Sequence, residues 1–172
     1  MNSERIERCF GSYGLELLPS RSGLRVALLY SGTADQRIAR TLALTGFVPA
    51  PDADLSPSMQ RIEAGASIGS TLKAAGWSVG KQTIDLEWIP VGTETLAWTG
   101  LNEPSDGAGL ALHIYRLTAE RGGETHLVAR IAELHHPDYL TLADLDRLFP
   151  ERLPPGTDDR AFMRQVRELL AR

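Results

Sequence analysis

Cysteine, long apolar runs and excess basic charge are missing from this sequence, and each absence excludes a class of protein. Cys9 is the only cysteine, which excludes an internal disulfide and any cysteine-rich zinc or iron–sulfur centre. A single thiol also fits a reducing compartment. We expect Cys9 to be a small buried apolar residue.

The composition also argues against membranes and nucleic acids as partners. No apolar run approaches the roughly 20 residues that cross a membrane as a helix. The opening residues, Met-Asn-Ser-Glu-Arg, lack the apolar core of a signal peptide. The 18 Lys and Arg residues are outnumbered by 22 Asp and Glu residues, whereas nucleic-acid affinity requires clustered basic side chains. We therefore expect a soluble, cytoplasmic protein with neither kind of partner.

The residues that are present are typical of one globular domain. Hydrophobic residues account for 42% of the chain and charged residues for 23%, close to the averages for folded proteins. A chain of 172 residues can bury a sizeable core without disulfides or metals. We therefore treat residues 1–172 as a single domain.

Short segments with strand-like composition recur along the chain, separated by turn residues. In 79–88, polar and apolar residues alternate with the period of two that indicates a strand. Because short turns make neighbouring strands antiparallel, we predict an antiparallel sheet of about six to seven strands. The expected strands are 13–18, 24–31, 38–47, 79–88, a short one at 95–98, 110–119 and 125–135, with a loop at 102–109.

Three helices are predicted beside this sheet. The segment 56–75 opens with Ser and Pro, an N-cap and a first-turn proline, and predicts one central helix. Thr141 and Asp144 form a capping box before a short helix, and Thr157 caps a last helix. This order of elements predicts an α+β fold with helices packed on one face of the antiparallel sheet, among them the central helix and two C-terminal helices.

A sheet covered by helices often holds a small molecule between the two layers. In size and in the order of its elements, the chain resembles chorismate lyase and related small-ligand sensor domains. The resemblance implies a fold with a small-molecule pocket. No shared motif carries a functional residue over to this sequence.

The densest set of functional side chains lies on the hairpin predicted at 110–135. If residues 121–123 form its loop, His113 lies opposite Ile131 and diagonal to Glu133. On that register, one face of the hairpin carries His113, Tyr115, Glu133 and His135.

Two readings of this face compete. Two imidazoles and a carboxylate are the ligand types of a mononuclear metal site, and with a tyrosine they suit acid–base chemistry on a small substrate. Alternatively, the face is a packed core with polar residues at its rim, because it also carries Ala111, Leu117, Leu127, Ala129 and Ile131. Since Ala129 and Ile131 offer no hydrogen-bond acceptor to orient a histidine ring, we predict no metal and no cofactor.

A second candidate site lies in the glycine-rich segment 65–71. It fails the phosphate-loop pattern because Ser70 stands where a lysine is required. Ser67 and Ser70, with nearby amides, could hold an anion or carboxylate if the helix is broken at Gly65. Alternatively, Gly65 and Gly69 let a continuous helix lie close to the sheet.

Together these patterns favour a small-molecule binding protein or small enzyme, with an anionic ligand held between sheet and helix. No nucleophile or dinucleotide motif is present, so the catalytic residues stay unknown. The candidate ligand-binding residues are His113, Tyr115, Glu133, His135, Ser67 and Ser70. The alternative is an accessory protein that docks onto a larger enzyme or complex through exposed tryptophans or an arginine stripe, namely Trp77, Trp88, Trp98, Arg160, Arg164 and Arg167.

Overall fold

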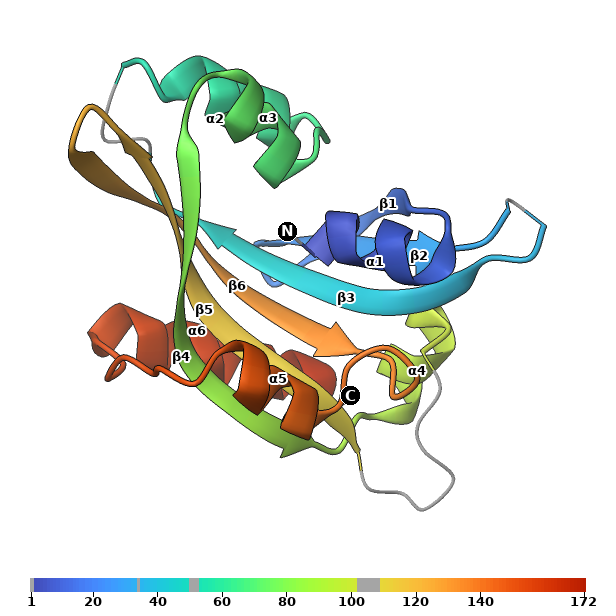
Figure 1. Ribbon diagram of the computed structural model, residues 1–172. Coiled ribbons are helices and arrows are strands. Elements are labelled where there is room, and N and C mark those ends of the chain that lie inside the picture. Colours follow the sequence, from blue (N-terminus) through green and yellow to red (C-terminus); the bar gives the residue numbers. More distant parts are fainter. Residues whose placement is uncertain (1, 34, 50–52, 102–108) are drawn as a thin grey trace.

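The computed structural model describes residues 2–33, 35–49, 53–101 and 109–172, and Figure 1 shows a twisted sheet with helices around it. Six strands form one antiparallel sheet in the order β1-β2-β3-β6-β5-β4. They are β1 (Gly14–Arg21), β2 (Leu24–Ser31), β3 (Ile38–Phe47), β4 (Ser78–Ile89), β5 (Leu110–Arg121) and β6 (Glu124–His135). Two three-stranded meanders therefore meet where β3 pairs with β6. The predicted α+β class and antiparallel sheet are confirmed.

Helices cover both faces of this sheet. Among the described residues they are α1 (Asn2–Phe10), α2 (Ser56–Glu63), α3 (Ile68–Ala74), α4 (Thr93–Thr99), α5 (Leu142–Leu148) and α6 (Thr157–Leu170). On one face α6 and α4 pack against the sheet, and on the other α2 and α3 cover one end while α1 and α5 cover the other. The expectation of helices on one face is wrong because the central strands carry apolar residues on both sides, and each side needs cover.

The central helical segment is two helices rather than one. Gly65, between α2 and α3, has a φ of 117°, a left-handed conformation that ends a helix and that other residues rarely adopt. The carbonyl of Ala66 then accepts a hydrogen bond from Arg25 of β2. The break therefore places the turn that precedes α3 against the sheet.

Two further segments differ from the sequence-based assignment. Residues 95–98, expected as a short strand, lie inside α4, which ends at Gly100 in a left-handed conformation. Residues 2–10, for which the sequence predicted no helix or strand, form α1, whose Ile6 is fully buried against the sheet. Of the loop expected at 102–109, all but the last residue lies outside the described residues.

Helix α1 also decides the environment of the single cysteine. Its buried side follows Asn2 and Ile6 at four-residue spacing, and Cys9 lies beside this stripe. Cys9 is exposed, so the expectation of a buried thiol is wrong.

Within the described ranges, no helix is long and apolar enough to span a bilayer.

The hairpin of β5 and β6 turns over two residues, the glycines at 122–123, rather than three. Both have the positive φ values that a two-residue hairpin turn requires. By itself, the shorter turn would shift the register by one residue and place His113 and Glu133 on opposite faces. A bulge next to Leu117 shifts the register by one more residue. His113 therefore pairs directly with Glu133 instead of Ile131. The predicted common face is confirmed, and the predicted diagonal placement is wrong.

Helix α6 is attached to the sheet by one buried carboxylate. Asp159 accepts hydrogen bonds from Nε of Arg130 at 2.8 Å, Nε of Arg116 at 3.2 Å and the amide of Gly156 at 2.7 Å. Arg116 and Arg130 are neighbours across β5 and β6, so both strands hold the same group. Gly156, rather than the predicted Thr157, is the N-cap of the helix.

The capping box of α5 is confirmed, and Thr141→Ala tests its contribution to stability. The Thr141 hydroxyl accepts from the Asp144 amide at 3.2 Å, and the Asp144 carboxylate accepts from the Thr141 amide at 3.0 Å. We expect Thr141→Ala to lower the free energy of unfolding in urea by about 1 kcal/mol. Thr157→Ala is the matched control, because Thr157 is exposed and caps no helix, and it should change stability by less than about 0.5 kcal/mol. Equal stability of the two variants would contradict the role of the cap.

Candidate functional site

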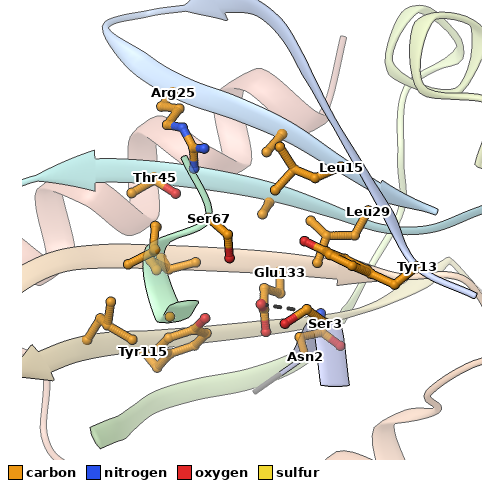
Figure 2. Close-up of a pocket in the computed structure, with 16 residues that line it drawn as sticks. Asn2, Ser3, Tyr13, Leu15, Arg25, Leu29, Thr45, Ser67, Tyr115 and Glu133 are labelled. Carbon is orange, nitrogen blue, oxygen red and sulfur yellow. Dashed lines mark hydrogen bonds between the residues drawn. The ribbon is translucent and has the colours of Figure 1, made fainter. Parts of the chain in front are cut away.

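Two pockets adjoin on the sheet face that α1, α3 and α5 cover. The sheet–helix pocket lies between the sheet, the start of α1 and the turn before α3, and Figure 2 shows its lining. The polar pocket, of about 330 Å³, lies between α1, α5 and strands β4 to β6. Asn2 and Glu133 line both pockets, and a hydrogen bond of 3.3 Å joins them. These two residues form the wall between the pockets.

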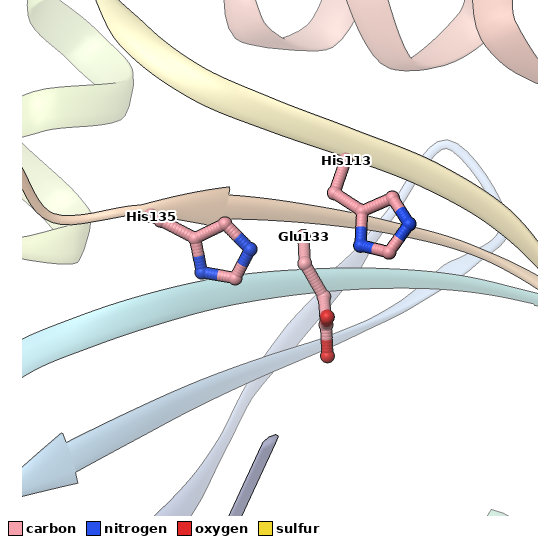
Figure 3. Close-up of side chains that lie close together, drawn as sticks. All are labelled: His113, Glu133 and His135. Carbon is pink, nitrogen blue, oxygen red and sulfur yellow. The ribbon is translucent and has the colours of Figure 1, made fainter. Parts of the chain in front are cut away.

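The polar pocket brings together three of the residues predicted from the sequence. His113, Glu133 and His135 are all buried in its wall. Because His113 pairs with Glu133 and His135 lies two residues further along β6, the three side chains point to one face. Figure 3 shows the two rings on either side of Glu133. One ligand atom from each residue lies within 4.8 Å of those of the other two.

Each of these histidines is held by one threonine. Oγ1 of Thr83 lies 3.0 Å from Nε2 of His113, and Oγ1 of Thr41 lies 3.0 Å from Nδ1 of His135. The other two ring nitrogens, Nδ1 of His113 and Nε2 of His135, are buried and have no hydrogen-bond partner among the described residues. Since a buried polar atom without a partner is costly, these nitrogens are suited to contact a bound molecule or ion.

Glu133 places a negative charge between the two rings. Nζ of Lys81 donates to its Oε2 at 3.0 Å, and Nδ2 of Asn2 donates to its Oε1. Burial by itself raises the pKa of this carboxyl, but the Lys81 ammonium and, once they are protonated, His135 and His113 together outweigh burial and hold the pKa of Glu133 well below its usual range. The same ammonium lies 4.1 Å from the centre of the Tyr115 ring, a cation–π contact. Glu133 is therefore ionised at neutral pH.

Both histidines of the polar pocket are neutral at neutral pH. Burial lowers the pKa of His113 to about 3 and the pKa of His135 to about 4, although the charge of Glu133 opposes both shifts. A neutral imidazole can accept a proton or coordinate a metal. Two neutral imidazoles and one carboxylate form a donor set that suits a divalent transition metal.

The sheet–helix pocket has an apolar floor and polar groups in its lining. Aliphatic side chains of the sheet form the floor, including Leu15, Leu29, Leu117 and Ile131. Hydroxyl groups also line the pocket: those of Thr45 and Tyr115 belong to buried residues, and those of Tyr13 and Ser67 to half-buried ones. In Figure 2, Arg25 lies at one end of this lining and Glu133 with Asn2 at the other. The pocket therefore offers a cation and an anion separated by an apolar surface.

Arg25 is the cation of the sheet–helix pocket. Its guanidinium is partly buried, its Nη2 donates to the carbonyl of Ala66 at 3.2 Å, and its Nε is buried without a partner. Burial lowers the pKa of Arg25. The group that partly offsets this lowering is the phenol of Tyr13 rather than a carboxylate. Among the residues that the structure describes, no carboxylate forms a salt bridge with Arg25, so its charge lacks a partner of opposite sign.

The predicted site residues divide between the two pockets. His113, His135 and Glu133 line the polar pocket, whereas Tyr115 and Ser67 line the sheet–helix pocket together with Glu133. Ser70 lines neither of these pockets: its side chain is exposed and donates to the Ser67 hydroxyl at 3.3 Å.

Sequence reasoning missed Lys81 because the alternation along β4 is interrupted. By a simple period of two, Lys81 and Asp85 share a face. A bulge at Ile84 reverses the alternation, so that Lys81 faces Glu133 while Asp85 pairs with Arg167 of α6 on the opposite face. The sequence carries no clear signal for this bulge.

Asn2 and Arg25 were missed for different reasons. Asn2 belongs to α1, a helix that the polar sequence of residues 2–10 did not predict. Arg25 did leave a signal, because it is the one charged residue in the otherwise apolar run of β2. A charge within such a run indicates a specific partner or a pocket.

The residues suggested for docking do not form one exposed aromatic surface among the described residues. Trp77 is 3% exposed, which corrects the expectation that it is a surface contact, and Trp88 is 41% exposed. The side chain of Trp98 lies outside the described part of the structure. In the arginine stripe, Arg167 forms salt bridges with carboxylates of β4.

The neutral histidines predict a specific acid sensitivity. Both have folded-state pKa values below the usual 6.5, so the unfolded chain binds more protons, and stability falls as pH drops from about 6.5 towards 4. His113→Gln and His135→Asn keep the nitrogen position that meets each threonine but do not titrate. Each should flatten the pH dependence of the urea-unfolding free energy by up to about 1.4 kcal/mol per pH unit, measured with chelator present between pH 6.5 and 5. A slope unchanged in both variants would show that the rings are not buried in the neutral form.

Comparison with known proteins assigns no family to this chain. No protein-family model matches it, and no curated protein matches its sequence significantly.

Proposed function

We propose that the protein binds a small amphipathic anion in the sheet–helix pocket, with a carboxylate group on Arg25 and an apolar body on the aliphatic floor. The observation that carries this proposal is the guanidinium of Arg25, which lines the pocket with a buried Nε–H that has no hydrogen-bond partner in the described part of the chain. A partly buried cation is stabilised when an anion pairs with it.

The donors around Arg25 favour a carboxylate. A guanidinium has five N–H donors in a planar fork, and the contact with the Ala66 carbonyl uses only one of them. A carboxylate can accept two parallel hydrogen bonds from such a fork. The hydroxyls of Tyr13 and Ser67 line the same pocket and can donate to the same oxygens.

The far end of the pocket favours a hydrogen-bond donor on the ligand. Glu133 is ionised and accepts hydrogen bonds only, so it suits a hydroxyl or amine at the end of the ligand opposite its carboxylate. Between the two ends, the aliphatic floor borders a space of only about 60 Å³, which suits a short branched chain. His113 and His135 lie on the other side of Glu133, in the lining of the polar pocket rather than of this one.

Paired carboxylic acids and amides test this proposal. Isobutyrate and isovalerate should bind and raise the thermal midpoint of wild-type protein, whereas isobutyramide and isovaleramide should not. Arg25→Met should weaken carboxylate binding about 10- to 100-fold in calorimetry, because it removes charge-assisted hydrogen bonds.

Arg164→Met is the matched control. Arg164 is an exposed arginine on α6, which packs on the opposite face of the sheet, so its loss removes the same charge without touching the pocket. Equal binding of acid and amide to the wild type, or equal loss of binding in both arginine variants, would refute the assignment of Arg25 as the anion-binding residue. Absence of any carboxylate binding would refute the proposal itself.

A further inference from the structure

We propose that His113, Glu133 and His135 bind one divalent transition-metal ion in the polar pocket. This site shares Glu133 with the sheet–helix pocket but not the anion-binding Arg25, so failure of metal binding and failure of carboxylate binding are distinguishable by experiment. Three protein ligands leave a further coordination position on the metal for water or a ligand, as in metal sites that take part in catalysis.

The hairpin supplies the geometry. Direct pairing of His113 with Glu133, and the two-residue step to His135, place all three donor groups on one face, within 4.8 Å of one another. Atoms bound to one ion at about 2.1 Å in tetrahedral geometry are about 3.4 Å apart. Rotations of the side chains that move each donor atom by about 1 Å therefore bring the three atoms to this spacing without moving the strands.

The threonines supply the outer support that a metal-binding histidine needs. Such a histidine donates its second ring N–H to an acceptor, which fixes the ring and leaves the other nitrogen for the metal. Thr83 and Thr41 contact one nitrogen of each ring, and the nitrogens without partners are on the side that faces Glu133 in Figure 3. The sequence-based expectation of no metal assumed that such acceptors were missing, and these two hydroxyls remove that objection.

Lys81 and Arg5 line the polar pocket with positive charge, which opposes a bound metal ion. The Lys81 ammonium lies 3.0 Å from Oε2 of Glu133 and balances the buried carboxylate. A metal ion bound at the same carboxylate competes with this ammonium for the negative charge and is repelled by it. Removing the lysine charge should therefore strengthen metal binding, whereas removing a ligand should abolish it.

Titration of Zn²⁺ into chelator-stripped protein tests the site. Wild-type protein should bind one Zn²⁺ per chain in competition with a chromogenic chelator. His113→Gln and His135→Asn should each weaken this binding by more than about 100-fold, since loss of a ligand exceeds the effect of an outer partner. His126→Gln is the matched control: His126 is absent from the cluster, and its loss should leave the affinity unchanged.

Two further variants separate a metal site from a purely structural network. Thr83→Val keeps the side-chain volume but removes the hydroxyl, and it should weaken Zn²⁺ binding about 10- to 100-fold. Lys81→Met should tighten Zn²⁺ binding. If the network only stabilises the fold, wild-type protein should not bind Zn²⁺, and neither variant should change that result.

Wild-type protein alone decides the matter if the variants fail to fold. Imidazole ¹⁵N NMR should then show that Zn²⁺ shifts the nitrogen resonances of His113 and His135. The proposal is overturned if Zn²⁺ does not bind stoichiometrically, if only the resonances of His126 or His136 respond, or if His113→Gln and His135→Asn retain wild-type affinity.

Discussion

The buried carboxylate of Glu133 is the interaction on which the arrangement of this face of the sheet depends. A charge in the middle of a sheet is tolerated only when other groups compensate it. Lys81 supplies the opposite charge from β4, and Asn2 supplies an amide from α1. Asn2 also donates to Thr41 of β3 at 3.1 Å. The N-terminal helix, an edge strand and two central strands therefore meet at one carboxylate.

Irregularities in the sheet deliver these groups to the same side. A bulge in the pairing of β5 with β6 compensates for the two-residue turn, and a bulge at Ile84 in β4 turns Lys81 and Thr83 towards the site. Each bulge changes which side chains face which layer. Beyond the bulge in β4, Asp85 reaches Arg167 of α6 on the other face. One strand thus presents a positive charge on one face of the sheet and a negative charge on the other.

Glu133 and Asn2 also connect the two pockets, because both residues line both of them. On one side of this wall lie an apolar floor and Arg25, and on the other lie two neutral imidazoles and Lys81. Under the two proposals, a metal ion at the imidazoles would compete with Lys81 for this carboxylate, and a donor on the anionic ligand would reach it from the opposite side. The two proposed sites therefore share Glu133.

Much of the architecture follows from the sequence by itself. Alternating residues and turn glycines predict five of the six strands almost to their ends, and the box at Thr141 predicts the start of α5, because these signals act over a few neighbouring residues. The common face of His113, Glu133 and His135 was also predicted. It came out right because two errors of register, in the turn and at the bulge, cancelled.

Only the tertiary structure decided which groups complete the site. Asn2, Lys81 and Thr41 are distant from Glu133 in sequence. The bulge in β4 brings Lys81 to Glu133, and the polar helix α1 brings Asn2 to it. Packing, rather than the local preference of these residues, selects both features. Arg25 faces a pocket because the chain breaks at Gly65 and the turn before α3 folds over β2. Local chemistry thus determined the strands and the histidine face, whereas burial of apolar surface on both sides of the sheet determined what surrounds them.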